Sequence, residues 1–324
     1  DYNYMGKLSF NEYIDAYTRS FRVVSMALRS VYSKARVYIS LDHLWNILQP
    51  HGKCYTSKST LDAFAKRLKQ EGDINWNLAF HPYPSPLTDP NFWNDKVTNS
   101  DSTKQVTMKN LGYLTNYVST HFRSDVRILL SEQGFTSVSY GTTNETLQAA
   151  AWAYAYYITE FNDKVDAFIM NRHVDHKQET SQGLYLGVWT NKKGNLEYAD
   201  KKKQIWNVFK YIDSAGSQKV SQFALKSIGI KSWSSVIPGF NWKKFSSMGS
   251  YTAGKGTGFK TVTKPKNITN SVKNGYNATV KKSGRKTTVK VHTSINPNLY
   301  VGADWRFSSK LNFTSRKYFT CKLN

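Results

Sequence analysis

The sequence is poor in cysteine and contains no long apolar run. Its two cysteines, Cys54 and Cys321, stand far apart and lack the paired spacing of metal ligands, so neither a disulfide framework nor a zinc site is predicted. We expect two free thiols, with a single disulfide as the alternative. No stretch reaches the ~18 apolar residues of a membrane span, and the longest, Ala149–Ile158, suits a buried helix. No signal peptide opens the sequence, so we expect a mature or truncated piece.

Several nucleotide-binding and hydrolase motifs are also missing. No Gly-x-Gly-x-x-Gly follows an expected strand, which argues against a dinucleotide-binding fold. No Gly-x-Ser-x-Gly occurs, so a Ser/His/Asp triad is not favoured. The glycine-rich stretch Ala253–Gly258 fails the P-loop spacing, and we interpret it as a linker.

Acidic residues are scarce in the last quarter of the chain. Residues 241–324 contain 17 Lys or Arg and one acid, Asp304, a formal charge of +16, whereas residues 1–240 carry only +7. Clusters of β-branched residues between Gly, Asn and Pro predict a small all-β module there, with strands near residues 261–263, 277–280, 287–292 and 299–301. We therefore divide the chain into residues 1–240 and 241–324.

The charge of the second part predicts binding to an anionic polymer, such as a cell-wall polymer. We do not expect nucleic acid as a partner, because the aromatic-basic strand motifs of RNA-binding sheets are missing.

Helices and strands alternate through the first part. Ser9 and Glu12 form a capping box that marks the first helix. Further helices are predicted over residues 59–70, 108–122, 145–161 and 201–212, and strands over residues 36–40, 75–80, 127–130 and 165–170. This alternation predicts an α/β fold with a parallel sheet. Four such units correspond to the C-terminal half of a (β/α)8 TIM barrel.

Polar residues follow each expected strand, which in a barrel places them at the catalytic end of the sheet. Glu132 comes directly after the apolar run Arg127–Leu130. Glycoside hydrolysis uses two carboxyl groups, and we predict that Glu132 is one of them. The predicted substrate-binding residues on the same rim are Asp42, His43, Trp45, His81, Tyr83, Arg172, Asp175 and His176.

Two kinds of contact are expected from these residues. His81 or Tyr83, one strand away, would hydrogen-bond Glu132 or a sugar hydroxyl, while Trp45, Trp93 and Trp189 are available to stack on sugar faces. A metal site is the less favoured alternative for the histidines and aspartates, because no His-x-His follows a strand. The set in question is Asp42, His43, His81, His173, Asp175 and His176. We predict no metal and no cofactor.

Four segments together resemble an uncharacterised bacterial domain family of the glycosidase superfamily. They are Arg36–Trp45, His81–Pro84, Ser131–Ser137 and Asp175–His176. This family of TIM barrels is similar to the retaining clan with two catalytic glutamates. The resemblance implies that Glu132 matches the nucleophile, which follows the seventh strand.

In that clan the acid/base glutamate follows the fourth strand, usually as Asn-Glu. Asn11-Glu12 does not qualify, since Glu12 belongs to the capping box. The resemblance therefore implies an acid/base residue upstream of Asp1 and little activity for this chain alone. Gly302–Ser315 resembles the opening strands of carbohydrate-binding jelly rolls.

Two functions follow as hypotheses. The first is a retaining glycoside hydrolase acting on a poly- or oligosaccharide, present here as the C-terminal half of its barrel. The alternative is a non-catalytic secreted or cell-wall protein that binds carbohydrate or anionic polymer on a barrel scaffold. Either protein is expected to be extracellular or at the surface of a bacterium.

Overall fold

The computed structural model describes residues 8–48, 54–192 and 198–248, together with four strands of the C-terminal segment. The chain forms two compact units, Asp1–Tyr251 and Thr252–Asn324. No helix among the described residues is long and apolar enough to cross a membrane.

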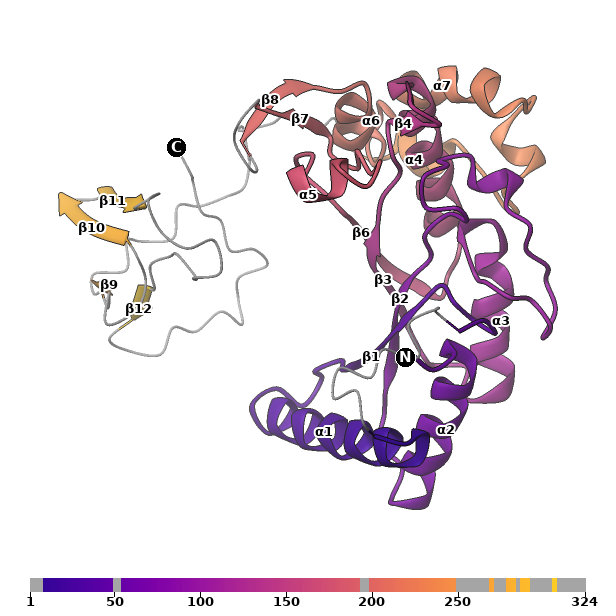
Figure 1. Ribbon diagram of the computed structural model, residues 1–324, viewed down its shortest axis with the longest axis vertical. Coiled ribbons are helices and arrows are strands. Elements are labelled where there is room, and N and C mark those ends of the chain that lie inside the picture. The colour runs from indigo at the N-terminus through magenta and orange to yellow at the C-terminus, as the bar shows by residue number, and fades with distance from the viewer. Residues whose placement is uncertain are drawn as a thin grey trace. The chain divides into compact units, whose positions relative to one another are not determined.

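A four-stranded parallel sheet forms the centre of the first unit (Figure 1). Its strands are β1 (Tyr38–Asp42), β2 (Asn77–His81), β3 (Ile128–Gln133) and β6 (Val165–Met170). They lie side by side in chain order, and each neighbouring pair is parallel. The predicted α/β fold with a parallel sheet is therefore confirmed. In the described residues β1 and β6 are free edges of this sheet, so a closed barrel is not shown.

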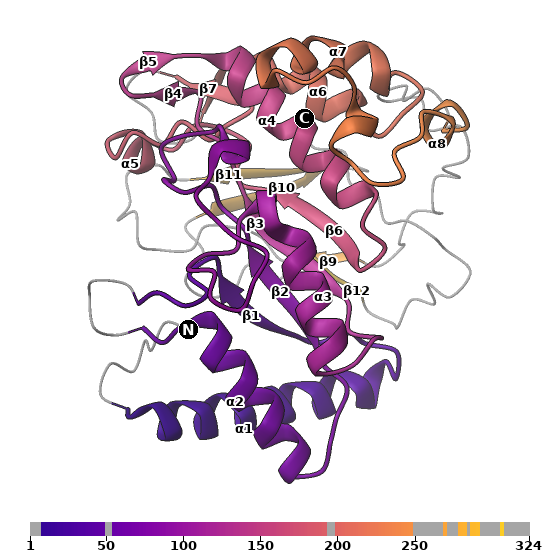
Figure 2. The ribbon, with the colours of Figure 1, turned by 90° about the vertical axis from the view of Figure 1, so that its right-hand side faces the viewer.

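The connecting helices cover one face of the sheet, as Figure 2 shows from that side. They are α2 (Ser57–Gln70), α3 (Leu111–His121) and α4 (Glu145–Glu160). The first helix, α1 (Phe10–Val31), precedes β1 and packs against α2, with the ring centroids of Phe21 and Phe64 5.0 Å apart. The predicted capping box is present, with the Ser9 hydroxyl accepting from the Glu12 amide and the Glu12 carboxylate accepting from the Ser9 amide. Asn144 caps α4 in a similar way by accepting from the Leu147 amide. Side-chain caps of this kind satisfy amides that have no partner inside the helix.

The core lies between the sheet and these helices. Strand residues that point toward the helices are fully buried, among them Ile39, Leu41, Leu78, Phe80, Ile128 and Leu130. The predicted inner face of α2, namely Leu61, Phe64 and Leu68, is also fully buried. Burial of such side chains stabilises the fold by about 1.5–3 kcal/mol each.

The opposite face of the sheet is more polar and partly exposed. Ser40 of β1 and Asp166 and Ala167 of β6 are exposed there. Asp166 pairs with Arg36 and also accepts from Arg127 at 2.7 Å. These ion pairs link three strands at the end of the sheet opposite to the one that carries Glu132.

The chain after β6 differs from the prediction of one helix over residues 201–212. A short helix, α5 (Lys177–Thr180), is followed by a hairpin of β7 (Trp189–Asn191) and β8 (Ala199–Lys202). The helix α6 (Ile205–Tyr211) begins only after Lys203, because Lys201 bonds to Thr190 across the hairpin. A further helix, α7 (Ser217–Ile228), occupies a region where the sequence pattern is weak.

Short elements complete the first unit. The hairpin β4 (Val138–Ser139) and β5 (Thr142–Thr143) precedes α4, and α8 (Lys243–Ser246) closes the unit. Short 3-10 helices cover Phe92–Asn94, Met108–Asn110 and Trp233–Ser235. Phe245 of α8 is buried against Tyr157, with ring centroids 5.5 Å apart, so residues 241–248 belong with the first unit rather than with the C-terminal segment.

The described residues of the second unit are all in strands. Strand β10 (Ala278–Ser283) pairs antiparallel with β11 (Lys286–Val291), and β9 (Ile268–Asn270) pairs antiparallel with β12 (Trp305–Phe307). The strands predicted near residues 277–280 and 287–292 are confirmed. Those predicted near residues 261–263 and 299–301 lie outside the described residues, as does most of Gly302–Ser315.

Candidate active site

Glu132 is the centre of a hydrogen-bond network at the carboxyl end of the sheet. The Tyr83 hydroxyl donates to Glu132 Oε1 at 2.7 Å. Asn171 Nδ2 donates to the Tyr83 hydroxyl oxygen at 2.8 Å and to Glu132 Oε1 at 3.3 Å. These residues follow or end the neighbouring strands β2, β3 and β6, so the parallel order of the sheet brings them together.

The backbone around Glu132 explains this geometry. The pairing of β3 with β6 is irregular between Leu130 and Gln133, which re-aims side chains at a strand end. The Asn171 amide donates to the Gln133 carbonyl at 2.7 Å. A Cβ atom on Gly134 would overlap the Asn171 carbonyl oxygen. Glycine after Glu-Gln therefore lets Asn171 approach the strand that carries Glu132.

Proton positions in this network follow from the donors. Burial, reinforced by the hydrogen bond to Glu132, raises the pKa of Tyr83 well above its ordinary value. The phenol is thus protonated at neutral pH. Because Asn171 donates to its oxygen, the phenol proton points to Glu132. The carboxylate therefore accepts from two neutral donors, an arrangement that suits a nucleophile or a charge-stabilising group.

A second carboxylate acts on the same hydroxyl through its charge. The charge of Glu179 on α5 also raises the pKa of Tyr83, after burial and Glu132. Glu179 Oε1 accepts from Arg172 at 2.7 Å, and its Oε2 is buried without a hydrogen-bond partner in the described part of the chain. The sequence pattern did not indicate Glu179, because it lies in a short helix seven residues beyond Arg172.

The ends of β1 and β2 add imidazoles to this edge of the sheet. His81 Nε2 lies 3.1 Å from the Ser131 hydroxyl of the next strand. Asp42, which is in register with His81, pairs with the His43 ring. Burial alone would raise the pKa of Asp42, but the hydrogen bond and charge of His43 lower it below its ordinary value. Of the two residues expected to contact Glu132, Tyr83 does so and His81 bonds to Ser131 instead.

Trp45 is not placed to bind a sugar. Its side chain is fully buried, and its ring packs against Phe80, Tyr113 and Tyr117 with centroids 5.2–6.4 Å apart. Its indole nitrogen donates to the Tyr113 hydroxyl at 3.3 Å. The expectation of stacking is wrong for this residue, because the chain turns inward after β1 and buries the indole in the core.

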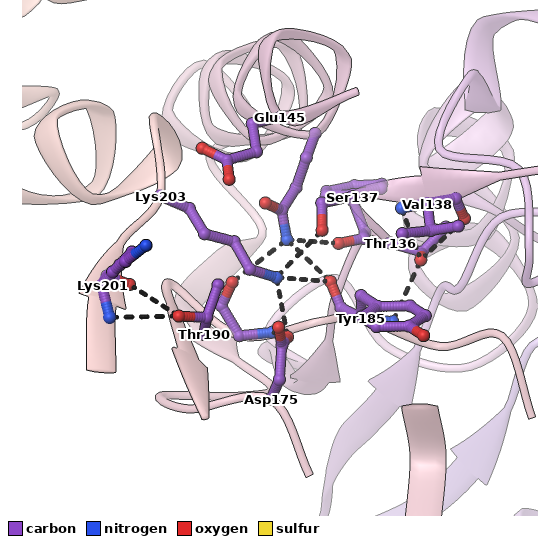
Figure 3. Close-up of polar contacts among 12 residues, drawn as sticks. Thr136, Ser137, Val138, Glu145, Asp175, Tyr185, Thr190, Lys201 and Lys203 are labelled. Carbon is purple, nitrogen blue, oxygen red and sulfur yellow. Dashed lines mark hydrogen bonds and ion pairs between the residues drawn. The ribbon is translucent and has the colours of Figure 1, made fainter. Parts of the chain in front are cut away.

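Asp175 is also buried rather than open to a substrate. It is 3% exposed, and its Oδ1 accepts from Lys203 Nζ at 2.7 Å and from the Gly187 amide at 2.8 Å. Lys203 further donates to the Ser137 hydroxyl and the Tyr185 carbonyl, as Figure 3 shows. Asp175 thus holds loops together, which corrects its assignment to the binding rim. Lys203 was missed because a lysine between a strand and a helix gives no sign of burial.

The remaining predicted residues lie on the segment after β6. Arg172 is paired with Glu179, and His176 precedes α5 with its side chain partly exposed. His173 is exposed. Among the described residues, no group of three or more His, Cys, Asp or Glu side chains is arranged to hold a metal ion. Asn171, which directly follows β6, is the contact to Glu132 that sequence reasoning overlooked in favour of the charged residues after it.

Comparison with known proteins gives a family and two distant structures. Residues 1–236 match the model of a family of unknown function (DUF5722). No curated protein matches the chain. A glucosidase from Croceicoccus marinus is 15% identical, with a TM-score of 0.41 over 70% of this chain and 39% of its own. The β-glycosidase BGL167 is 12% identical, with a TM-score of 0.37 over 68% of this chain and 50% of its own. The chain thus spans half or less of the length of either structure.

Proposed function

The chain belongs to the family of unknown function DUF5722, and we propose that its first unit is part of a retaining glycoside hydrolase with Glu132 as nucleophile. One observation carries the proposal. A carboxylate at the end of a parallel strand accepts from Tyr83 at 2.7 Å and from Asn171 at 3.3 Å. Neutral donors from both neighbouring strands fix the carboxylate without neutralising its charge.

The chemistry proceeds through a covalent intermediate. The free oxygen of Glu132 attacks the anomeric carbon while the glycosidic C–O bond breaks and the departing oxygen takes a proton from a general acid. Water, deprotonated by the same group, then hydrolyses the glycosyl ester and restores the carboxylate. Tyr83 and Asn171 orient Glu132 for attack. Because both donors are neutral, they can keep their hydrogen bonds to Oε1 when the carboxylate becomes an uncharged ester. Retention requires a second carboxyl group about 5–5.5 Å from the nucleophile. Among the described residues, Glu179 is, besides Glu132, the carboxylate whose charge raises the pKa of Tyr83.

The test separates the nucleophile from the acid. A dinitrophenyl leaving group departs without protonation, so it reports on the nucleophile even where general acid catalysis is weak. We would incubate the chain with a panel of dinitrophenyl 2-deoxy-2-fluoroglycosides and locate the adduct by peptide mass spectrometry. Labelling of Glu132, absent in Glu132→Gln, is the expected result. An adduct on another carboxylate would exclude Glu132 as the nucleophile.

A second candidate function rests on charge alone. Residues 241–324 carry +16 with one acid, which favours non-catalytic binding of an anionic polymer. Such binding weakens steeply as salt rises. Retention on a polyanion column that does not change between about 50 and 200 mM salt would argue against it.

A further inference from the structure

The hairpin after α5 and the start of α6 gather two tryptophans and two lysines. The indoles of Trp189 and Trp206 have centroids 6.4 Å apart and nearly perpendicular rings. Lys202 is in register with Trp189, and its ammonium lies 3.8 Å from the centre of Trp206 and 5.3 Å from that of Trp189. Lys210, on the next turn of α6, places its ammonium 4.7 Å from the centre of Trp206. We call these four residues the Lys–Trp patch.

Within the part of the chain that the structure describes, the two ammonium groups of the patch have no carboxylate partner. Among the described residues, neither Lys202 nor Lys210 has an ion pair within 4.0 Å. This contrasts with Lys203 beside them, which is buried and paired with Asp175. Cation–π contacts fix the position of an ammonium but leave its charge uncompensated. Two like charges around one indole repel each other, and a bound anion would relieve this repulsion.

The surroundings of the patch are basic and rich in exposed aromatic surface. In the described residues from Val188 to Ile212, Asp200 is the single acid, while Lys192, Lys201, Lys202 and Lys210 reach the surface and Lys203 is buried against Asp175. Tyr198 and Phe209 are 61% and 47% exposed. Flat aromatic side chains offer contact area to the C–H faces of sugars, and the lysines offer charge to an acidic substituent.

The patch is tied to the rim that carries Glu132. The Trp189 amide donates to the His173 carbonyl at 3.1 Å, and the Trp189 carbonyl accepts from the Asp175 amide at 3.0 Å. His173 lies two residues beyond Asn171, a span of at most ~7 Å along the backbone. The strand that carries Trp189 is therefore hydrogen-bonded to the segment that leaves the rim at Asn171.

We propose that the Lys–Trp patch is a binding subsite for an acidic glycan, one whose sugars carry carboxylate groups. The choice of a glycan over another polyanion rests on the proposed function. Lys202 and Lys210 would pair with the carboxylates, while Trp189 and Trp206 contact the sugar rings. The patch would thus restrict the substrate to acidic polysaccharides.

The test measures protection of individual lysines in the full chain. We would acetylate the Glu132→Gln chain with and without an oligogalacturonate and read each lysine by mass spectrometry. Because each site is read separately, anion binding by residues 241–324 does not obscure the result. We expect the rate of acetylation of Lys202 and Lys210 to fall about fivefold when the free oligogalacturonate concentration is ~4 times its Kd. Lys201, exposed in the same strand but outside the ring contacts, is the internal control and should react unchanged.

Matched ligands and a variant complete the test. A neutral cello-oligosaccharide of equal length and an oligothymidylate of equal charge should protect neither lysine. Trp206→Leu should remove the protection by releasing both ammonium groups. Equal protection of Lys201, protection by the neutral sugar, stronger protection by the oligothymidylate, or none at all would each overturn the proposal. Protection without fluorosugar labelling of Glu132 would leave the subsite standing and remove the proposed function.

Discussion

Lys203 and Asp175 form an ion pair of 2.7 Å in which both side chains are nearly fully buried. The pair connects the segment after β6 with the end of β8, and Lys203 extends the link to Ser137 before β4 (Figure 3). Burial raises the pKa of Asp175 and lowers the pKa of Lys203, in each case against the effect of the partner. The pair therefore compensates two desolvated charges and fixes the loop that follows Asn171.

Removing one partner should destabilise the fold strongly. Lys203→Met leaves Asp175 as a buried charge without its cation, which costs about 3–5 kcal/mol of unfolding free energy. Urea denaturation followed by tryptophan fluorescence measures the change. Lys201→Met, an exposed lysine two residues earlier, should stay within about 0.5 kcal/mol of the parent chain. Equal stability of the two variants would show that the pair does not support the fold.

The double variant Asp175→Leu/Lys203→Met gives a complementary result. It removes both charges and should recover much of the stability lost in Lys203→Met, because a buried pair and an apolar replacement are often similar in stability. A double variant as unstable as the single one would instead assign the loss to the hydrogen bonds with Ser137 and Tyr185.

Asp95 should make the stability depend on pH near 6. Burial raises its pKa to about 6, although the Ser85 amide donates to its Oδ1 at 3.2 Å. A raised folded-state pKa means that the folded chain binds the proton more tightly. The stability that proton binding by Asp95 contributes is therefore complete below its unfolded-state pKa of 3.8, and it is lost as the pH rises through the folded-state pKa of about 6.

The matching variant is Asp95→Asn, which cannot ionise. The unfolding free energy of Asp95→Asn minus that of the parent chain should rise by about 1–3 kcal/mol as the pH is raised from 4.5 to 7.5. Urea denaturation at three pH values measures this gain. A difference between the two chains that is the same at every pH would contradict the assignment.

Gly134 should be required for the contact between Asn171 and Glu132. A Cβ atom there would overlap the Asn171 carbonyl oxygen, so Gly134→Ala must push the end of β6 away from β3. We expect labelling of Glu132 by the fluoroglycoside to slow at least about tenfold, as for the loss of one hydrogen bond to a charged group. Gly112→Ala is the matched control for stability, because no atom lies within 4 Å of the position of its Cβ and its backbone is helical within α3. Unchanged labelling in Gly134→Ala would show that Asn171 does not assist Glu132.

The sequence pattern predicted the elements better than the directions of the side chains. The strand over residues 165–170 has the predicted bounds, because β-branched and apolar residues are bracketed there by polar ones. The order of strands and polar residues also predicted, correctly, that Tyr83 and Glu132 lie at the same edge of the sheet. Trp45 and Asp175 were misplaced, since the fold of a loop decides whether a residue after a strand points inward. No local signal marks these directions.

Partners distant in sequence were also beyond prediction. Lys203 is 28 residues from Asp175, and Tyr83 is 88 residues from Asn171. Periodicity reports the face of a helix or strand, but it does not report which loops meet. The network around Glu132 therefore became visible only with the three strand ends in place.

The hydrogen bond from Tyr83 to Glu132 should matter for reactivity and little for folding. Tyr83→Phe keeps the ring and removes the donor at 2.7 Å, which leaves Asn171 as the donor to Oε1. Hydrogen bonds to a charged group contribute about 1.5–3 kcal/mol, so the rate of Glu132 labelling should fall about 10- to 150-fold. Stopped-flow detection of dinitrophenolate measures this rate. Ser131→Ala, which removes the contact with His81 one residue away, is the control and should change the rate less than about threefold. If Tyr83→Phe reacted at the parent rate, Tyr83 would only fill space beside Glu132, and the proposed role of the network would fail.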